Sequence, residues 1–95
     1  WKFVADMPII SAFYGLTIYM YFLDNRRHKL PHIHVSYDGS DIVVEIPSGK
    51  IIEGTLRRKQ RRLVQAWIEI HNDDLMANWE RAISGKSVST IDPLS

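Results

Sequence analysis

The sequence predicts an α+β domain, with an antiparallel β-meander of four or five strands followed by two α-helices that pack on one face of the sheet. In the first half of the chain, apolar residues alternate with polar ones, which is the period of a strand with one buried face. Turns that contain glycine separate these runs, and Asp38-Gly39 is a strong two-residue hairpin signal. After Arg57 the apolar residues recur every three or four positions, as in a helix. Strands followed by helices are typical of the α+β class.

Length and composition fit one globular domain. The chain has 95 residues, of which 45% are hydrophobic and 24% are charged. Met7-Pro8 resembles a natural start, so we expect a single domain over residues 7–95, with residues 1–6 upstream of it. Cysteine is absent, which excludes a disulfide scaffold, a cysteine zinc site and a thiol nucleophile. No apolar run reaches the roughly 18–20 residues of a membrane span, and no signal-peptide pattern is present, so we expect a cytoplasmic protein without a membrane partner.

Six segments carry the strand pattern. They cover residues 9–14, 16–22, 32–37, 40–46, 50–56 and, last and shortest, 87–91. Residues 23–31 are polar and end in a proline, which disfavours a helical conformation at the residue before it. We therefore expect a loop between the second and third strands.

Two helices are expected in the second half. The first ends near His71-Asn72, and the second is capped by Asn72 or Asp73 and ended by Gly85. The apolar face of the first helix consists of Leu63, Val64, Trp67 and Ile70, and that of the second consists of Leu75, Trp79, Ala82 and Ile83. We expect Leu63, Trp67, Leu75 and Trp79 in the core.

The hairpin turn also predicts which side chains share a face. A two-residue turn at Asp38-Gly39 places His34 opposite Val43 and His32 opposite Glu45, on the face away from the core. The next turn is expected to be three residues long, because it then places Glu53 beside Glu45 and keeps that carboxylate off the core face. The predicted catalytic face, turned toward water, therefore consists of His32, His34, Glu45 and Glu53.

Three kinds of chemistry fit this face. Two imidazoles about 7 Å apart along a strand suit two ligands of a zinc-like ion with a carboxylate as the third, so a divalent metal on His32 and His34 stays open as the cofactor. The same groups suit an acid–base pair that cleaves a phosphodiester without a metal. Alternatively, they form cross-strand pairs that only stabilise the sheet. No other cofactor motif is found.

Charge is distributed unevenly. Residues 26–62 carry nine Lys or Arg against four Asp or Glu, a net charge of +5, whereas residues 63–95 carry two against five, a net charge of −3. Five of the six residues 57–62 are cationic and precede a helix, where positive charge opposes the helix dipole, so a functional reason is expected. Phosphate is the natural ligand for arginines at a helix start. The predicted nucleic-acid contacts are Arg26, Arg27, Lys29, Arg57, Arg58, Lys59, Arg61 and Arg62.

Two further interpretations accompany this cation run. It could instead pair with acidic residues of the second helix, namely Asp73, Asp74 and Glu80. If exposed, Tyr19, Tyr21 and Tyr37 would offer stacking surfaces for bases.

Several short motifs resemble the small bacterial family known as domain of unknown function 4160. The most specific are Phe13-Tyr14-Gly15 and Pro31-His32-Ile33-His34. The others are Met7-Pro8-Ile9-Ile10, Ile18-Tyr19-Met20-Tyr21-Phe22, Glu53-Gly54, Asn78-Trp79 and Ile91-Asp92-Pro93-Leu94. Family members usually carry two prolines before the first histidine, where this chain has Leu30 and Pro31. The resemblance supplies no catalytic residues. It implies a short bacterial protein often encoded beside a second small protein, in pairs that look like toxin–antitoxin modules.

Three functions fit these observations. The first is a toxin-like, ribonuclease-like protein that engages RNA through its cations and reacts at its histidines. The second is a non-catalytic antitoxin or regulatory partner that binds nucleic acid or its small neighbour protein. The third is a metal-binding domain. We favour the first two together, as a component of a toxin–antitoxin-type module that engages RNA, with a small cognate protein as partner and a homodimer as a further option.

Overall fold

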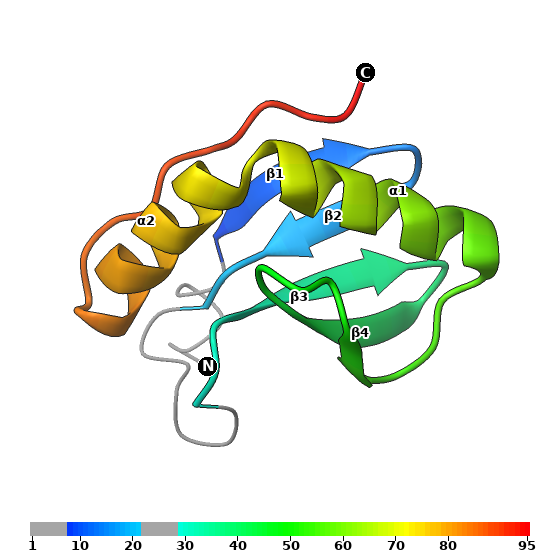
Figure 1. Ribbon diagram of the computed structural model, residues 1–95, viewed down its shortest axis with the longest axis horizontal. Helices are drawn as coiled ribbons and strands as arrows, with labels where there is room; N and C mark the ends of the chain where they lie inside the picture. The colour runs from blue at the N-terminus through cyan, green and yellow to red at the C-terminus, as the bar shows by residue number, and fades with distance from the viewer. Residues whose placement is uncertain (1–7, 22–28) are drawn as a thin grey trace.

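The computed structural model describes residues 8–21 and 29–95, and its elements follow the expected order. The five strands are β1 (Ile9–Phe13), β2 (Leu16–Tyr19), β3 (His32–Tyr37), β4 (Ser40–Glu45) and β5 (Ile51–Glu53). The two helices are α1 (Arg58–Ile70) and α2 (Asn72–Ile83). Each strand pairs antiparallel with the next, so the sheet order is β1-β2-β3-β4-β5 (Figure 1). The predicted α+β meander with two C-terminal helices is confirmed.

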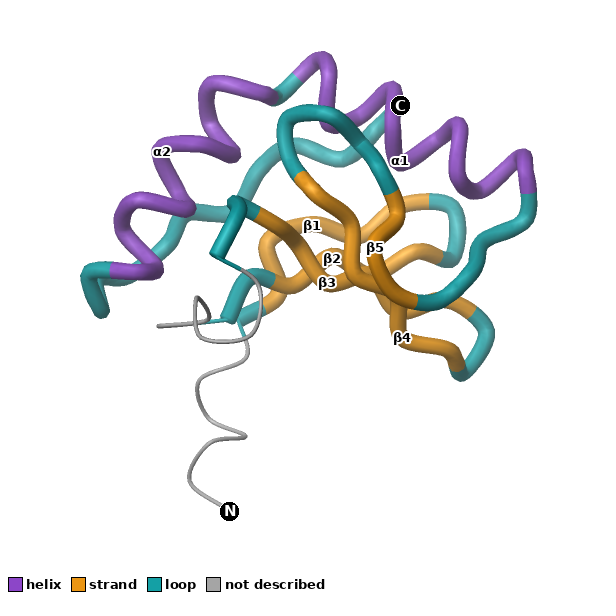
Figure 2. Tube along the Cα trace, turned by 60° about the horizontal axis from the view of Figure 1, so that its bottom comes forward, coloured by secondary structure: helices purple, strands orange, loops and turns teal. Residues whose placement is uncertain are grey.

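Both helices lie on the same side of the sheet (Figure 2). α1 crosses the sheet, and α2 lies toward the end of the sheet where β3 begins (Figure 1). One cluster of buried side chains joins the two layers, with Trp67 of α1 at 0% exposure. Leu75 and Trp79 are buried as predicted, and Leu63 packs against the cluster from its edge. No helix within residues 8–21 and 29–95 is long and apolar enough to cross a membrane.

The predicted apolar face of α1 is wrong at one position. Ile70 is 66% exposed, and Ile68 is buried in its place. Ile68 follows Val64 and Trp67 at the four-residue and one-residue spacings of a broad helical face, whereas Ile70 lies at the last turn, where the chain turns away into α2.

Of the two predicted caps of α2, the C-terminal one is confirmed and the N-terminal one is wrong. Gly85 has a φ of 72° and ends α2, with Gly85 N–H donating to Ala82 O and Lys86 N–H donating to Arg81 O. This is the hydrogen-bond pattern of a Schellman cap, as predicted. The N-cap of α2 is His71, without a side-chain bond, so neither Asn72 nor Asp73 has the predicted capping role.

The C-terminal segment is held by side chains and is not a strand. Residues 87–91 were expected to form a last strand, but only Ile91 bonds to the sheet, through its N–H to Ile10 O at 2.8 Å. Asn78, which is 1% exposed, bonds twice to the backbone of Ser89: its Nδ2 donates to the carbonyl at 2.8 Å and its Oδ1 accepts from the N–H at 3.0 Å. The Trp67 indole N–H donates to Asp92 O at 2.8 Å. Two buried polar side chains therefore hold this segment against the helices and the outer edge of β1.

Candidate nucleic-acid interface and histidine cluster

The predicted site residues fall at the two ends of the sheet. β3 begins at His32 and ends at Tyr37, so these ends are separated by about 17 Å of strand. We call the end with His32, His34 and Glu45 the histidine end, and the end with the β3–β4 turn and the start of α1 the arginine end. The β1–β2 turn also lies at the arginine end, whereas α2 lies at the histidine end (Figure 1).

The β3–β4 register is as predicted. His34 lies opposite Val43, and His32 lies opposite Glu45. Asp38 and Gly39 both have positive φ values, 50° and 79°, as a type I′ hairpin turn requires. The turn sequence therefore fixed which side chains of β3 and β4 face each other.

The predicted pairing of Glu45 with Glu53 is wrong. Glu53 lies opposite Val43 instead. Glu45 N–H bonds to Lys50 O at 2.8 Å and Val44 lies opposite Ile51, and the register then shifts by one residue between Val44 and Val43, as in a β-bulge. The turn between β4 and β5 rests on α1: the Gln65 amide donates to Gly49 O at 3.0 Å, and a Cβ on Gly49 would lie 2.9 Å from Gln65 Cγ. The register of β5 therefore depends on this turn and on the shift within the strand pair, neither of which strand alternation predicts.

His32 does not face water as predicted. It is 1% exposed, and its Nδ1 donates to Leu30 O at 2.9 Å, since a carbonyl oxygen can only accept. The centre of its ring lies 5.0 Å from that of Trp79 in α2 and 5.2 Å from that of His34. His32 is the first residue of β3, where α2 closes the end of the sheet, so strand alternation no longer determines its exposure.

His34 belongs to a row of aromatic rings on the sheet face away from α1. It is half-buried and stacks on Tyr21, with ring centres 4.1 Å apart and planes 6° from parallel. Tyr19 meets Tyr21 edge-on at 6.3 Å. The row continues through His32, whose ring lies at 69° to that of His34 and at 57° to that of Trp79, so both imidazoles pack against aromatic rings.

The two carboxylates lie on β4 and β5, and Glu45 is the residue opposite His32. Glu45 accepts a 2.6 Å hydrogen bond from the Ser48 hydroxyl in the neighbouring turn. Glu53 is two strands away from His34, roughly 10 Å at the usual strand spacing, with Val43 between them at 8% exposure. Within the described ranges, no three His, Asp or Glu side chains are placed to hold a metal ion.

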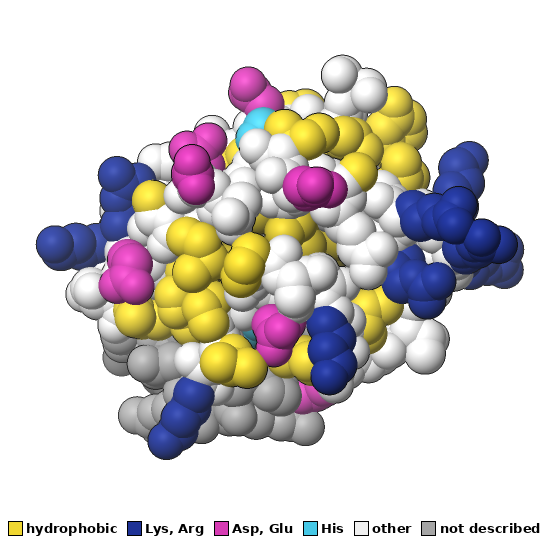
Figure 3. Space-filling view, in the orientation of Figure 1, with side chains coloured by type: hydrophobic (Ala, Val, Ile, Leu, Met, Phe, Trp, Pro, Cys, Tyr) yellow, Lys and Arg dark blue, Asp and Glu magenta, His cyan; other side chains and the backbone are white. Residues whose placement is uncertain are grey.

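The arginine end presents a dense positive patch, which we call the cation cluster. Its members, all exposed, are Arg57, Arg58, Lys59, Arg61 and Arg62. Figure 3 shows Lys and Arg side chains gathered at this end of the molecule, on the right. α1 has no acidic residue in its first turn, and its N-cap, Arg57, makes no side-chain cap bond. Among the described residues, none of these five side chains forms a hydrogen bond or an ion pair, so the predicted alternative of pairing with α2 has no support.

The other three predicted nucleic-acid contacts are Lys29, Arg26 and Arg27. Lys29 is exposed but lies three residues before β3, beside the histidine end. Arg26 and Arg27 lie outside the described residues. Of the predicted contacts that the structure describes, those in the cation cluster are therefore Arg57, Arg58, Lys59, Arg61 and Arg62.

A family model for a domain of unknown function, DUF4160, matches residues 15–80. The chain belongs to the DUF4160 family. The match runs from the β1–β2 turn into α2 and so includes both ends of the sheet and the cation cluster. No match was found to a curated protein or to a solved structure. Because the family description assigns no activity, the function has to be argued from geometry.

Beside the cation cluster, the matched DUF4160 region contains a cavity that sequence reasoning missed. It measures about 180 Å³ and is lined by Tyr37, Asp38, Ser40, Thr55, Leu56 and Arg57. Gly54 makes it possible: its φ is 82°, and a Cβ there would lie 3.0 Å from Asp41 O, so the loop after β5 passes directly over β4. In the sequence, Asp38-Gly39 predicts only the β3–β4 turn. No local pattern indicates that the loop after β5 lies against this turn.

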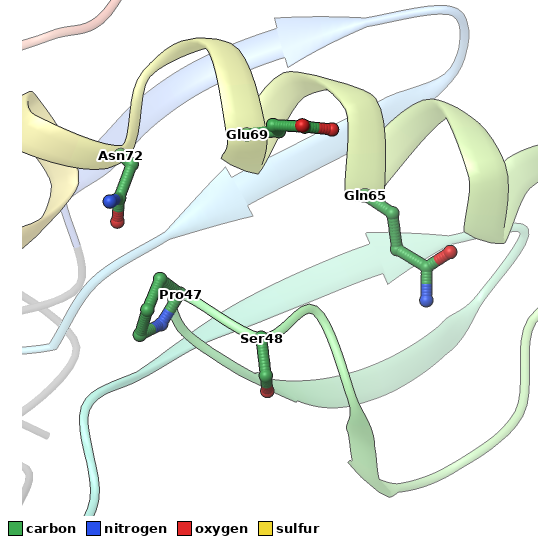
Figure 4. Close-up of a pocket in the computed structure, with 5 residues that line it drawn as sticks. All are labelled: Pro47, Ser48, Gln65, Glu69 and Asn72. Atoms are coloured by element: carbon green, nitrogen blue, oxygen red, sulfur yellow. The ribbon is translucent and has the colours of Figure 1, made fainter.

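A second, larger cavity of about 430 Å³ lies between the β4–β5 turn and the helices. Its lining residues are Pro47, Ser48, Gln65, Glu69 and Asn72 (Figure 4). Gln65 and Asn72 extend from the helices toward the turn in this view. The lining contains one carboxylate, that of Glu69, and no Lys or Arg, so this cavity does not extend the positive surface of the cation cluster.

Proposed function

We propose that this DUF4160 domain binds RNA through the cation cluster, as the non-catalytic component of a toxin–antitoxin-type module. One observation carries the proposal: five exposed cations, none with a hydrogen-bond or ion-pair partner among the described residues, lie at the start of α1, where they oppose the helix dipole. Nothing in the described fold compensates for this arrangement. A polyanion would do so.

The physics of phosphate binding fits this patch. Each cation that contacts a phosphate releases condensed counterions, so affinity falls with salt in proportion to the number of contacts. Five contacts on a single strand would lower affinity about 100-fold between about 50 and 200 mM salt. Such contacts position a nucleic acid without reading its sequence.

The separation of the two ends favours binding over catalysis. An acid–base pair must reach the reacting phosphate, and cations must hold that phosphate in place. His32 is buried, and β3 runs for about 17 Å from it to the arginine end of the sheet. A phosphate bound at the arginine end would therefore be beyond the reach of the histidine pair.

The proposed partner protein is inferred from the family resemblance, which implies that family members are often encoded beside a second small protein. Co-purification of this chain with the product of its neighbouring gene tests it. A stable complex is expected, and elution of the two proteins as independent species would contradict the partner role.

Charge reversal tests RNA binding. The double variant Arg58→Glu/Arg61→Glu should bind a fluorescein-labelled uridine octamer at least tenfold more weakly than wild type in low salt, measured by fluorescence anisotropy. The matched control is Lys29→Glu/Lys86→Glu, which makes the same charge change at exposed positions outside the cluster. Equal weakening by the two double variants, or none by the first, would refute the cation cluster as the binding surface.

Catalysis remains the second candidate, because the His32 and His34 rings lie 5.2 Å apart. The test is prolonged incubation of labelled RNA with wild type and with His34→Ala. We expect no cleavage by either. Cleavage that disappears in His34→Ala would contradict the non-catalytic role.

A further inference from the structure

The cavity between the β3–β4 turn and the loop after β5 shares a residue with the cation cluster. Arg57 lines the cavity and begins the cluster, so a strand whose phosphates lie on the cluster passes the cavity mouth. Its volume of about 180 Å³ equals that of about six water molecules, which is the scale of one nucleobase. The cavity is therefore placed and sized to take one unpaired base.

Asp38 gives this cavity a specific chemistry. It is exposed and lines the cavity together with Arg57 of the cation cluster, yet its carboxylate forms no ion pair with a described residue. A carboxylate at this place repels phosphate, so it weakens plain backbone binding. It offers two adjacent acceptor oxygens, which suit a partner with two adjacent donors.

Tyr37 supplies an aromatic surface in the same cavity. The ring is half-buried and packs against the β1–β2 turn, where a Cβ on Gly15 would lie 3.5 Å from Tyr37 Cε1. Tyr14 in that turn is 59% exposed and offers a second ring at the same end. Stacking on aromatic rings is the usual way in which proteins hold unpaired bases.

We propose that this cavity receives an unpaired guanine base of a single-stranded RNA whose phosphates lie on the cation cluster, a proposal that rests on the function proposed above. Guanine presents two adjacent donors, N1–H and the N2 amino group, to the two oxygens of Asp38. Uracil offers one ring N–H, and adenine and cytosine each place an acceptor nitrogen beside their amino group. Guanine is thus the base that matches the carboxylate at both positions.

Three octamers test the base preference. They are a uridine octamer, the same octamer with one central guanosine, and the same octamer with inosine at that position, which lacks the N2 amino group. We expect the guanosine octamer to bind wild type at least about fivefold more tightly than the uridine octamer, with the inosine octamer in between.

Asp38→Asn tests the residue. Asparagine adopts the positive φ of 50° found at this position, so the turn is retained. The amide replaces one acceptor with a donor, and the ratio of guanosine to uridine affinity should fall to near one. Asp41→Asn is the matched control: it removes the same charge from the same hairpin outside the cavity lining, and it should keep the wild-type ratio.

The outcomes separate this inference from the proposed function. A wild-type ratio near one, with salt-dependent binding of both octamers, refutes the guanine site and leaves RNA binding by the cation cluster intact. The guanine site is also refuted if the Asp38→Asn variant keeps the wild-type ratio of guanosine to uridine affinity. Failure of both octamers to bind in low salt refutes the proposed function, and the guanine site with it.

Discussion

The histidine end and the arginine end of the sheet are built in opposite ways. At the histidine end, polar side chains are buried and partnered: His32 bonds to Leu30 O and packs between aromatic rings. At the arginine end, five exposed cations, without an ion-pair partner in the part of the chain that the structure describes, lie at a helix start, where charge of that sign is unfavourable. The packed histidine therefore stabilises the fold, whereas the exposed cations at the start of α1 lower its stability.

This contrast shows which residues call for a functional explanation. In the sequence, the paired histidines are the stronger indication of a catalytic or metal site. In the structure, their contacts with aromatic rings explain their presence by packing. The arginine run is a weaker motif, but nothing in the described fold accounts for it. Residues that oppose local energetics without compensation are better indicators of a binding surface than residues with catalytic potential.

The largest effect is expected at the histidine end. His32→Ala removes a side chain at 1% exposure and leaves the Leu30 carbonyl without its donor. The cavity and the lost hydrogen bond should together lower the free energy of unfolding by about 3 kcal/mol. Chemical denaturation measures this change.

His34→Ala is the matched control, because the second imidazole is only half-buried. It should cost about 1 kcal/mol. Neither substitution should change the RNA affinity of the folded protein more than twofold. If His32→Ala unfolded no more readily than His34→Ala, the packing role of the histidine end would be wrong.

A smaller effect is expected for the side chain that holds the C-terminal segment. Asn78→Ala removes both bonds to the Ser89 backbone from a site at 1% exposure, which should cost about 2 kcal/mol. Ser89→Ala keeps those backbone bonds and loses only a hydroxyl contact with Arg81, so it should stay within about 0.5 kcal/mol of wild type. Equal stability of the two variants in denaturation would show that Asn78 does not hold the segment.

Much of the fold could be predicted from the sequence. Alternation predicts the strands, and the Asp38-Gly39 turn predicts the β3–β4 register residue by residue, because a turn of known length leaves no freedom. The burial of Trp67 and Trp79 follows from helical spacing. These features depend on residues close together in the chain.

What could not be predicted depends on contacts between distant segments. His32 is buried because α2 closes one end of the sheet. Glu53 is displaced because the register shifts within the β4–β5 pair, next to a turn that Gln65 of α1 contacts. The cation cluster was predictable, since five cations in six residues are exposed in almost any fold. Its cavity was not, because it depends on Gly54 passing close to the backbone of β4.

The smallest expected effect is a gain in stability, and it directly tests whether the arginine end lowers stability in order to bind a ligand. Arg57 has the extended conformation of an N-cap, with φ −62° and ψ 155°, but no capping side chain. Arg57→Ser should supply the missing bond to the first turn of α1 and remove an unfavourable charge, raising the free energy of unfolding by about 1 kcal/mol. The same variant should lower RNA affinity and reduce the slope of log affinity against log salt by about 0.7. Lys86→Ser, an exposed lysine after α2, should change neither quantity. Higher stability with undiminished affinity would mean that the arginine end is a defect of the fold, not a surface kept for a ligand.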